Sequence, residues 1–454
     1  MWLVHMVKLN HIHFIRLIMA LAAVPPGMLP AFAGTTYTAN PDTYLEKLRI
    51  LGPGSSLQLM PGEYKHGLPI RYLHGTVQAP ITISGPDKEP RAVFVARSGH
   101  STISIINSSY IAIRNLDLDG RNLPVDGVKC EGHADWAHHI TLDGLSVRGH
   151  GNNQQTVAIS TKCPAWDWII RNNVIKAAGT GLYLGNSDGR APFIAGLIEH
   201  NLIVDTLGYN LQIKHQQPRP ALPEMPQERS ATIIRHNVFS KANQGSSQKM
   251  ARPNVLVGHW PLAGPGADDR YLVYGNFFYQ NPHESLFQGE GNIALYNNLF
   301  VNHFGDAIRL QPHNDTTRAI SVFCNTVIAN GSGIAFVRRE HDQAYPQFAT
   351  ANIVFARLPV HGISSGENLT GEWDEAQKYL ARPFAPLGEM SLVPAGKEMQ
   401  AYPEESMRLD LYPEVDLDFD GALHVTGRMG AYALDRDKPS WLPVLEIKPT
   451  SAAR

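Results

Sequence analysis

The feature that most constrains the fold of this chain is a phrase that repeats along most of its length. The phrase is a short alternating strand, an Asn or Gly, a second apolar strand and a polar turn, as in residues 197–205 (LIEHNLIVD) and 293–302 (IALYNNLFVN). The turn Asn recurs at positions 115, 173, 201, 237, 276, 298 and 325, with uninterrupted spacings of 28, 22 and 27 residues. A repeat of this period predicts a solenoid.

The strands within each repeat are short and rich in β-branched residues, and no helical pattern separates one repeat from the next. This pattern excludes leucine-rich and βαβ repeats. We therefore predict an all-β fold, a single-stranded right-handed parallel β-helix over residues 55–340, with about ten to twelve coils. Successive coils stack about 4.8 Å apart, so residues at equivalent positions form ladders. The shared phase of the Asn residues favours an internal Asn ladder over ordinary turn residues.

Both ends of the predicted solenoid need capping elements, because an open end exposes unpaired strand edges. Residues 34–54 are predicted to form the N-terminal cap, with a short amphipathic helix that follows Asn40. Residues 341–454 lose the repeat and become rich in Pro. We expect them to form an irregular tail that runs along the solenoid and covers its end, with a helix over residues 372–382 and a strand at 422–427.

The N-terminus has the pattern of an export signal. Lys8 and Arg16 precede an apolar run over residues 17–24, and Ala31 and Ala33 are small residues at the positions that specify cleavage. Three Pro residues interrupt a stretch already too short for a membrane-spanning helix. We expect residues 1–33 to be a signal peptide, cleaved after Ala33, and the mature protein to be periplasmic or secreted, with no membrane span.

The charge composition limits the partners that the chain can have. Only 18% of the residues are charged and the formal net charge is −2, which argues against a nucleic-acid partner or a membrane surface. The 43% of hydrophobic residues suffice for a large core. We expect a monomer.

The cysteine count leaves the redox state open. Cys130 and Cys163 end comparable strand phrases and are expected on neighbouring coils, where the Cα separation lies within the disulfide range. Two buried free thiols are slightly favoured, because ladders in a β-helix stack similar residues without bonding them. Cys324 is the third cysteine.

Three segments carry a resemblance to a known group. Residues 54–64 (GSSLQLMPGEY), 75–86 (GTVQAPITISGP) and 110–120 (YIAIRNLDLDG) resemble the first coils of bacterial right-handed β-helix proteins that act on polysaccharides, including the alginate lyase and chondroitinase B family, and residues 288–302 are similar to a later coil. The resemblance covers roughly residues 40–340 and implies a polysaccharide substrate. Lyases of this family use a Lys base and an Arg acid beside an acidic calcium site, and this chain does not match that set.

The candidate site follows from the geometry of the repeat. If Leu182, Leu211, Val255 and Ile308 point inward, the alternating and strand-end residues of the same coils form an outward stripe. That stripe contains cationic, His and aromatic side chains, which suit an extended anionic sugar chain: Tyr183, Lys214, His215, His259, Trp260, Glu290, Arg309, His313 and Arg338.

These residues predict a polysaccharide lyase that acts on a uronate by β-elimination. The reaction needs a base for the C5 proton, a group that neutralises the carboxylate and an acid for the leaving oxygen. We assign Lys214, His215 and His259 to catalysis, and Arg235 and Arg309 to bidentate binding of carboxylates. Long loops at 216–230, 241–253 and 261–270 are expected to line the cleft.

Two other classes of function stay open. A glycoside hydrolase acting on an exopolysaccharide needs two carboxyl groups, for which Asp117 and Asp119 have suitable spacing, although ordinary outward Asp residues are the favoured interpretation. A polysaccharide-binding or assembly protein without catalytic activity could use the same stripe. No cofactor is certain, but Asp268 and Asp269 could bind Ca²⁺ together with Glu290 or Glu284.

Overall fold

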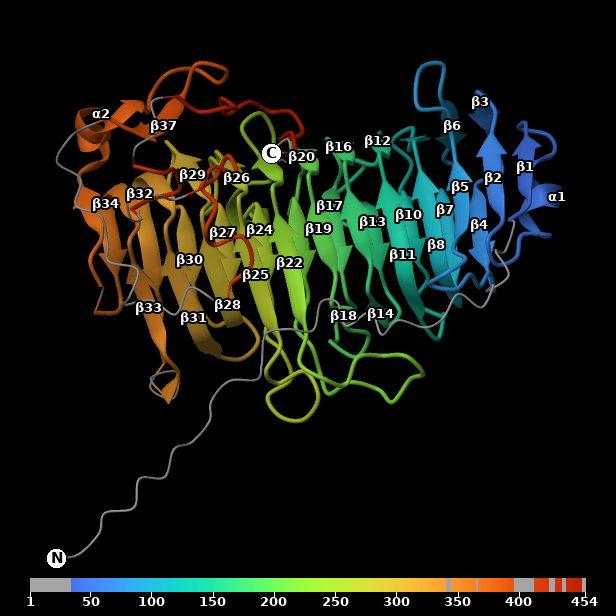
Figure 1. Cartoon of the computed structure of the whole chain (residues 1–454), viewed down its shortest axis with the longest axis horizontal. Coiled ribbons are helices and arrows are strands. Elements are labelled where there is room, and N and C mark those ends of the chain that lie inside the picture. Colours follow the sequence, from blue (N-terminus) through green and yellow to red (C-terminus); the bar gives the residue numbers. More distant parts are fainter. Residues whose placement is uncertain are drawn as a thin grey trace, which may run out of the picture. The chain divides into compact units, whose positions relative to one another are not determined.

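The computed structural model describes residues 34–339, 344–364, 366–395, 412–423, 429–434 and 438–450. The chain is mostly β and forms two long parallel sheets of 14 and 21 strands, arranged as in a parallel β-helix. Figure 1 shows the strands following one another along the long axis in the order of the sequence. The predicted signal peptide, residues 1–33, lies outside the described residues.

The chain visits three ribbons of parallel strands in turn, and we call one such circuit a coil. Sheet A contains β1 (Thr36–Ala39), β2 (Ser56–Leu59), β5 (Ile81–Ser84), β8 (Ser108–Arg114), β11 (Ala137–Asp143), β14 (Ala165–Trp166), β15 (Ile169–Arg171), β18 (Phe193–Ile194), β19 (Leu197–Glu199), β22 (Ala231–Arg235), β25 (Arg270–Tyr274), β28 (Gly291–Tyr296), β31 (Thr317–Phe323) and β33 (Gln347–Thr350).

The larger sheet consists of two ribbons, which join at its C-terminal end. Ribbon 1 contains β3 (Gly62–Tyr64), β6 (Ala92–Val95), β9 (Leu116–Asp119), β12 (Ser146–Arg148), β16 (Val174–Lys176), β20 (Leu202–Val204), β23 (Val238–Ser240), β26 (Phe277–Tyr279), β29 (Leu299–Asn302), β32 (Thr326–Phe336), β34 (Ile353–His361) and β35 (Leu369–Gly371). Ribbon 2 contains β4 (Leu68–Arg71), β7 (Ile103–Ile106), β10 (Val128–Cys130), β13 (Val157–Thr161), β17 (Thr180–Leu184), β21 (Leu211–Ile213), β24 (Val255–Val257), β27 (Phe287–Gly289), β30 (Ile308–Leu310) and the second half of β32. Parallel pairing therefore begins at β1 and ends at β35, a wider span than residues 55–340.

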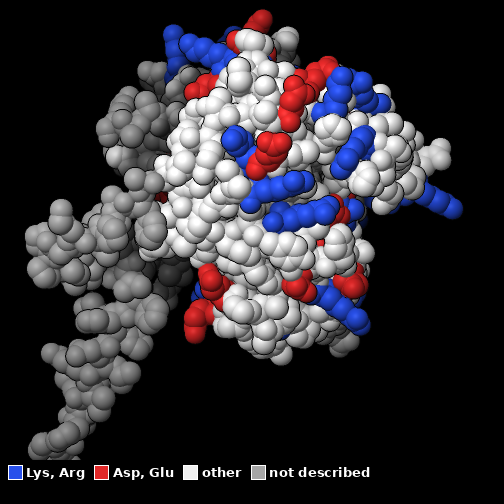
Figure 2. All heavy atoms as spheres, turned by 90° about the vertical axis from the view of Figure 1, so that its right-hand side faces the viewer, with Lys and Arg blue, Asp and Glu red and all other residues white. Residues whose placement is uncertain are grey.

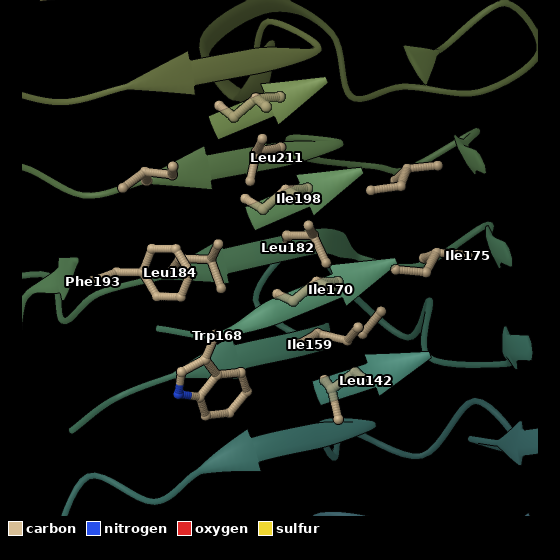
Figure 3. Packing of buried hydrophobic residues seen from close by; sticks show 14 of the residues in the cluster. Leu142, Ile159, Trp168, Ile170, Ile175, Leu182, Leu184, Phe193, Ile198 and Leu211 are labelled. Atoms are coloured by element: carbon tan, nitrogen blue, oxygen red, sulfur yellow. The ribbon is translucent and has the colours of Figure 1, made fainter. Parts of the chain in front are cut away.

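The core lies between the three ribbons and is filled by one side chain in two from each strand. Leu182, Leu184 and Leu211 are fully buried there, as the sequence pattern predicts. Figure 3 shows these side chains stacked in rows with Ile170 and Ile198 from neighbouring coils. Apolar side chains at equivalent positions thus pack on one another along the axis, and this stacking fixes the register of the coils.

An asparagine ladder runs along the turn between sheet A and ribbon 1, and it confirms the predicted ladder over most of its length. Each side-chain amide donates to the Oδ1 of the Asn one coil further on, at 2.9–3.0 Å, through Asn173, Asn201, Asn237, Asn276, Asn298, Asn325, Asn352 and Asn368. Asn115 is outside the ladder. It has a φ of 55° and donates to Asp87, while Leu116 occupies the ladder position of that coil.

The expected helix is present at the N-terminal end, whereas the helix expected over residues 372–382 is shorter and ends at Tyr379. Helix α1 (Tyr44–Leu48) buries Tyr44 and Leu48 against the first coil, and Asn40 accepts hydrogen bonds from the turn that leads into it. Near the other end lie the 3₁₀ turn η3 (Trp373–Glu375), helix α2 (Ala376–Tyr379) and the hairpin of β36 (Leu380–Arg382) and β37 (Ser391–Pro394). A further 3₁₀ turn, η1 (Gln248–Met250), lies in the loop before β24. The strand predicted at 422–427 falls largely outside the described residues.

The C-terminal tail covers the outward faces of two ribbons in the later coils. Leu392, Phe419 and Tyr432 pack with outward apolar residues of ribbon 1, such as Phe277. Lys448 is buried, donates to the carbonyls of Gly275 and Phe419, and its own carbonyl lies 2.8 Å from Nδ1 of His200. Figure 1 shows this segment returning to the middle of the solenoid, near β20.

Neighbouring coils of ribbon 2 are joined covalently. Cys130 and Cys163 form a disulfide with a Cα separation of 6.0 Å. The slight preference for two free thiols is therefore wrong. Cys163 lies two residues past the end of β13, where the turning chain directs its side chain toward that of Cys130. Cys324 is a buried free thiol.

Candidate functional site

Ribbon 2 is the ribbon on which polar and cationic side chains gather. Residues 216–230 follow β21. Residues 241–253 precede β24, and residues 261–269 follow it. The three long loops predicted from the sequence therefore emerge at the two edges of this ribbon. Outward residues of its floor, Gln212, Leu256 and Gln288, are only 4–7% exposed. Flanking chain consequently rises above the floor in these coils.

Two lysines lie at equivalent positions, two coils apart, directly after their strands. The pairing of β13, β17 and β21 places Lys162, Gly185 and Lys214 level with one another. Two coil steps of about 4.8 Å separate the backbones of the lysines by about 10 Å. Gly185 between them has a φ of 89°, and a Cβ there would approach Lys214 Cβ to 3.3 Å. Both lysines thus border a position that carries no side chain.

Tyr183 projects between the same lysines. Lys162 Nζ lies 3.3 Å from the centroid of the Tyr183 ring, and Lys214 Nζ lies 5.9 Å from it. Burial lowers the pKa of Lys162 to about 8, and it also lowers the pKa of Lys214. Burial raises the pKa of Tyr183, which keeps its hydroxyl protonated near neutrality. The cluster therefore holds one amine, that of Lys162, which deprotonates more readily than an ordinary lysine, beside a phenol that can donate a proton.

A pair of histidines lies beside Lys214: His215 directly follows it, and His259 is level with His215 on the adjacent coil. The rings of His215 and His259 lie 5.4 Å apart, on adjacent coils. His259 is 5% exposed, and its Nδ1 lies 2.8 Å from the carbonyl of Trp260. His215 is half-buried, and its Nδ1 has no hydrogen-bond partner among the described residues. Burial, followed by the charge of Lys214, lowers the pKa of His215. The structure therefore brings all three predicted catalytic residues to one face.

The later coils carry the rest of the predicted stripe. Glu290 is fully buried and accepts hydrogen bonds from the backbone N–H groups of His313, Asn314 and Asp315. Its carboxylate therefore holds a turn in place. Arg309 is level with Gln288 and forms an ion pair of 3.2 Å with Asp306. Arg338 follows β32 and is half-buried.

Two predicted substrate-binding residues lie elsewhere, which corrects the sequence interpretation. Arg235 is on β22 of sheet A and forms ion pairs with Glu199 and Glu414. It points outward, but each coil has three outward faces and this one is covered by the tail. Trp260 is fully buried and stacks on Tyr271, with 4.3 Å between the ring centroids. The chain turns inward after β24, so the strand phase does not extend to Trp260.

The carboxylates considered for hydrolysis or calcium are engaged in other contacts. Asp117 and Asp119 lie on ribbon 1 and form ion pairs with Arg91 at 3.3 Å and Arg148 at 3.4 Å. Asp269 is buried with Arg219 and accepts a hydrogen bond of 2.6 Å from the Ser230 hydroxyl. Among the described residues, no group of three or more His, Cys, Asp or Glu side chains is arranged to hold a metal ion. The proposed calcium ligands therefore do not fit such a site.

The N-terminal coils of ribbon 2 contain a cationic cavity of about 250 Å³. It lies beside Ser104 and Lys129, which are level with Ser160 and Tyr183 of the coils that follow. Figure 2 shows several Lys and Arg side chains gathered with a few acidic ones on the N-terminal end of the molecule. The lining includes Arg71, Arg97, His100, Lys129, Glu131 and His133.

Comparisons with known proteins give likenesses of fold. No protein-family model and no curated protein matches the sequence. Among solved structures, the chain is similar to an alginate lyase of Paenibacillus, at 16% identity over 74% of this chain and 99% of that one, with a TM-score of 0.42. It is also similar to a lacto-N-biosidase of Eubacterium ramulus (10% identity, 74% and 68% covered, TM-score 0.49) and to an α-1,3-glucanase of Streptomyces thermodiastaticus (14%, 78% and 71%, 0.42). At identities of 10–16% and TM-scores of 0.42–0.49, these likenesses concern the fold alone.

Proposed function

We propose that this protein is an exported polysaccharide lyase that cleaves an anionic, uronate-containing polysaccharide on ribbon 2 of a single-stranded right-handed β-helix. The observation that carries the proposal is the pair Lys162 and Lys214 on either side of Gly185, with Tyr183 between them. A uronate over Gly185 would have an amine on each side and a phenol beside it. Those are the groups that β-elimination requires.

In the proposed reaction, Lys162 in its neutral form removes the C5 proton of the uronate. Lys214 in its protonated form neutralises the carboxylate, on which negative charge develops as the proton leaves, and the neighbouring His215 can donate a hydrogen bond to it. The C4–O bond then breaks, a C4–C5 double bond forms, and the Tyr183 hydroxyl protonates the leaving oxygen. We assign Lys162 to the base because its pKa, about 8, places more neutral amine at neutral pH than an ordinary lysine has.

The polymer would lie along ribbon 2, because sugar residues and coils repeat at a similar spacing of about 5 Å. In one direction it would reach the cationic cavity beside Lys129, two coils before Gly185. In the other it would reach Arg309 and His313. Arginines at both ends can bind carboxylates bidentately.

The proposed export agrees with the covalent chemistry of the chain. Disulfides such as Cys130–Cys163 persist mainly in oxidising compartments, which include the periplasm and the exterior of the cell. No helix among the described residues combines the length and apolar character needed to cross a bilayer. We propose a periplasmic or secreted location.

The test is incubation of the purified protein with a panel of anionic and neutral polysaccharides. Ultraviolet absorbance of an unsaturated uronate together with new reducing ends supports the lyase. New reducing ends without that absorbance would assign a hydrolase instead, and binding without cleavage would assign a binding protein. On a substrate that is cleaved, we expect Lys162→Met and Lys214→Met each to lower kcat about 10²- to 10⁴-fold.

A matched control separates loss of chemistry from loss of charge or folding. Lys176 is an exposed lysine on ribbon 1, so Lys176→Met removes the same charge from another face. We expect full activity in this variant and an unchanged melting temperature in all three. Full turnover in both Lys162→Met and Lys214→Met would contradict the assignment.

A further inference from the structure

A second cavity, of about 480 Å³, lies at the start of the sheet A strands, away from the lysines of ribbon 2. It is bounded by the N-terminal coils and by the tip of the loop 216–230, which reaches back along the solenoid. The hydroxyl of Tyr110 donates a 2.7 Å hydrogen bond to Glu224 at that tip. The other main lining side chains are His74, Ser109, Trp136 and His138.

Several residues around this cavity have a left-handed backbone conformation. Tyr110, His139 and Asp167 lie level on three successive coils and have φ values of 57°, 52° and 54°. Glu224 has a φ of 59°. Each such residue costs of order 1 kcal/mol. Residues with such φ values recur in turns along the described solenoid, so the lining side chains and not these φ values identify the site.

The side chains in this row contact one another. The Tyr110 ring stacks on His139 with 4.2 Å between centroids, and His139 Nε2 lies 3.6 Å from the carboxylate of Asp167. His138 stacks on the buried Trp166 at 4.5 Å and lies 4.9 Å from Trp136. The cavity wall is therefore a set of fixed aromatic rings, which lose little conformational entropy when a ligand binds.

The electrostatics of this cavity differ from those of ribbon 2. Burial lowers the pKa of His138 to about 4, so its ring is uncharged near neutrality. The hydrogen bond to Glu224 raises the pKa of Tyr110 to about 12. No Lys or Arg is among the described residues that line the cavity, and Glu224 brings a carboxylate to its rim. A sugar that carries a carboxylate would be repelled here.

We propose that this cavity is a second carbohydrate-binding site, which takes an uncharged sugar residue. Trp136 offers an apolar ring face to the sugar ring, while Glu224 and Ser109 offer oxygen atoms to its hydroxyl groups. The volume lies within the range of small-molecule sites. This site stands independently of the proposed cleavage, since it shares no lining residue with the lysine cluster.

The test measures binding by calorimetry and by saturation-transfer NMR, with no cleavage assay. The probes are neutral oligosaccharides of glucose, galactose and mannose, and an oligouronate for comparison. We expect at least one neutral probe to bind, and both Trp136→Ala and Glu224→Gln to weaken that binding about tenfold or more. Tyr72→Ala, which removes an aromatic side chain that is 67% exposed and outside the cavity, should leave it unchanged.

Two results would overturn the proposal. One is the absence of binding by every neutral probe at millimolar concentration. The other is neutral-probe binding that survives Glu224→Gln and Trp136→Ala, which would locate it elsewhere. Glu224 is on an exposed loop, so its variant keeps the test informative even if Trp136→Ala does not fold. Both binding results can be interpreted even if the protein shows no lyase activity, because the test measures no cleavage.

Discussion

Replacing Asn237 by Ala should destabilise the protein by roughly 4 kcal/mol. Its amide donates to the carbonyls of Ile198 and Arg235 at 2.9 Å and to Asn276 Oδ1 at 3.0 Å. Its Oδ1 accepts from the backbone N–H of Asn201 at 3.0 Å and from the side-chain amide of Asn201 at 2.9 Å. The amide has two N–H groups shared among three acceptors, so with the two accepted bonds Asn237 makes about four full hydrogen bonds of about 0.5–1.5 kcal/mol each. The site is 0% exposed, so water cannot replace the lost partner.

The matched control is Asn368→Ala at the last rung of the ladder. Asn368 accepts from the backbone and side chain of Asn352 and donates to two carbonyls, but it is half-buried and one of those bonds is exposed. Water can restore part of what is lost there, and we expect a loss of about 1–2 kcal/mol. Asn237→Leu should lower the free energy of unfolding about as much as Asn237→Ala, because Leu fills the space without forming the ladder hydrogen bonds.

The assay is denaturant unfolding followed by circular dichroism, with native-state hydrogen exchange of the ladder N–H groups. Hydrogen exchange is needed because a stack of coils can open locally, so that its unfolding departs from two-state behaviour. A loss in Asn237→Ala no larger than that in Asn368→Ala would refute the view that the ladder hydrogen bonds stabilise the coils. Recovery of stability in Asn237→Leu would attribute the loss to packing instead.

Three further outcomes are expected. On an established substrate, kcat should rise with pH through about 8, because the neutral fraction of Lys162 increases from about a tenth at pH 7 to a half at its pKa; a flat profile would contradict its role as base. Ile213→Asp should prevent folding, since Ile213 is 1% exposed and an isolated carboxylate cannot be accommodated in the core; a soluble, cooperatively melting variant would show that the strand phase is wrong. Thiol titration of the denatured, non-reduced protein should find one free thiol, Cys324, whereas three would exclude the bridge.

The sequence pattern predicted the fold because every coil must bury the same kinds of side chain at equivalent positions. Stacked Leu and Ile rows and the Asn ladder leave a periodic signal that one sequence suffices to detect. Asn115 looked like a ladder member because it sits one residue before the ladder position, and only the strand pairing separates the two. The capping helix was likewise predictable from Asn40 and the apolar spacing after it.

The candidate site was less predictable, because it depends on the phase of each strand and on which of three faces a residue occupies. Lys214 and Tyr183 lie on the expected face, whereas Arg235 points outward from a different sheet. Lys162 was overlooked, although it follows its strand as Lys214 does, and alignment of the segments 157–162 and 209–214 would have placed them together. The cavity near Trp136 had no such signal, since it is completed by Glu224, 114 residues after its partner Tyr110 in the sequence.

The docking of Lys448 has a consequence for how the protein is made. Each strand pairs with one from the preceding coil, so coils can close one after another as the chain emerges from the ribosome or the translocation pore. Lys448 instead meets partners 248 and 173 residues earlier, at His200 and Gly275. Its segment can take its place only after those coils exist, and a chain stalled in synthesis before Lys448 would leave His200 and the carbonyl of Gly275 without this partner and open to proteases and chaperones.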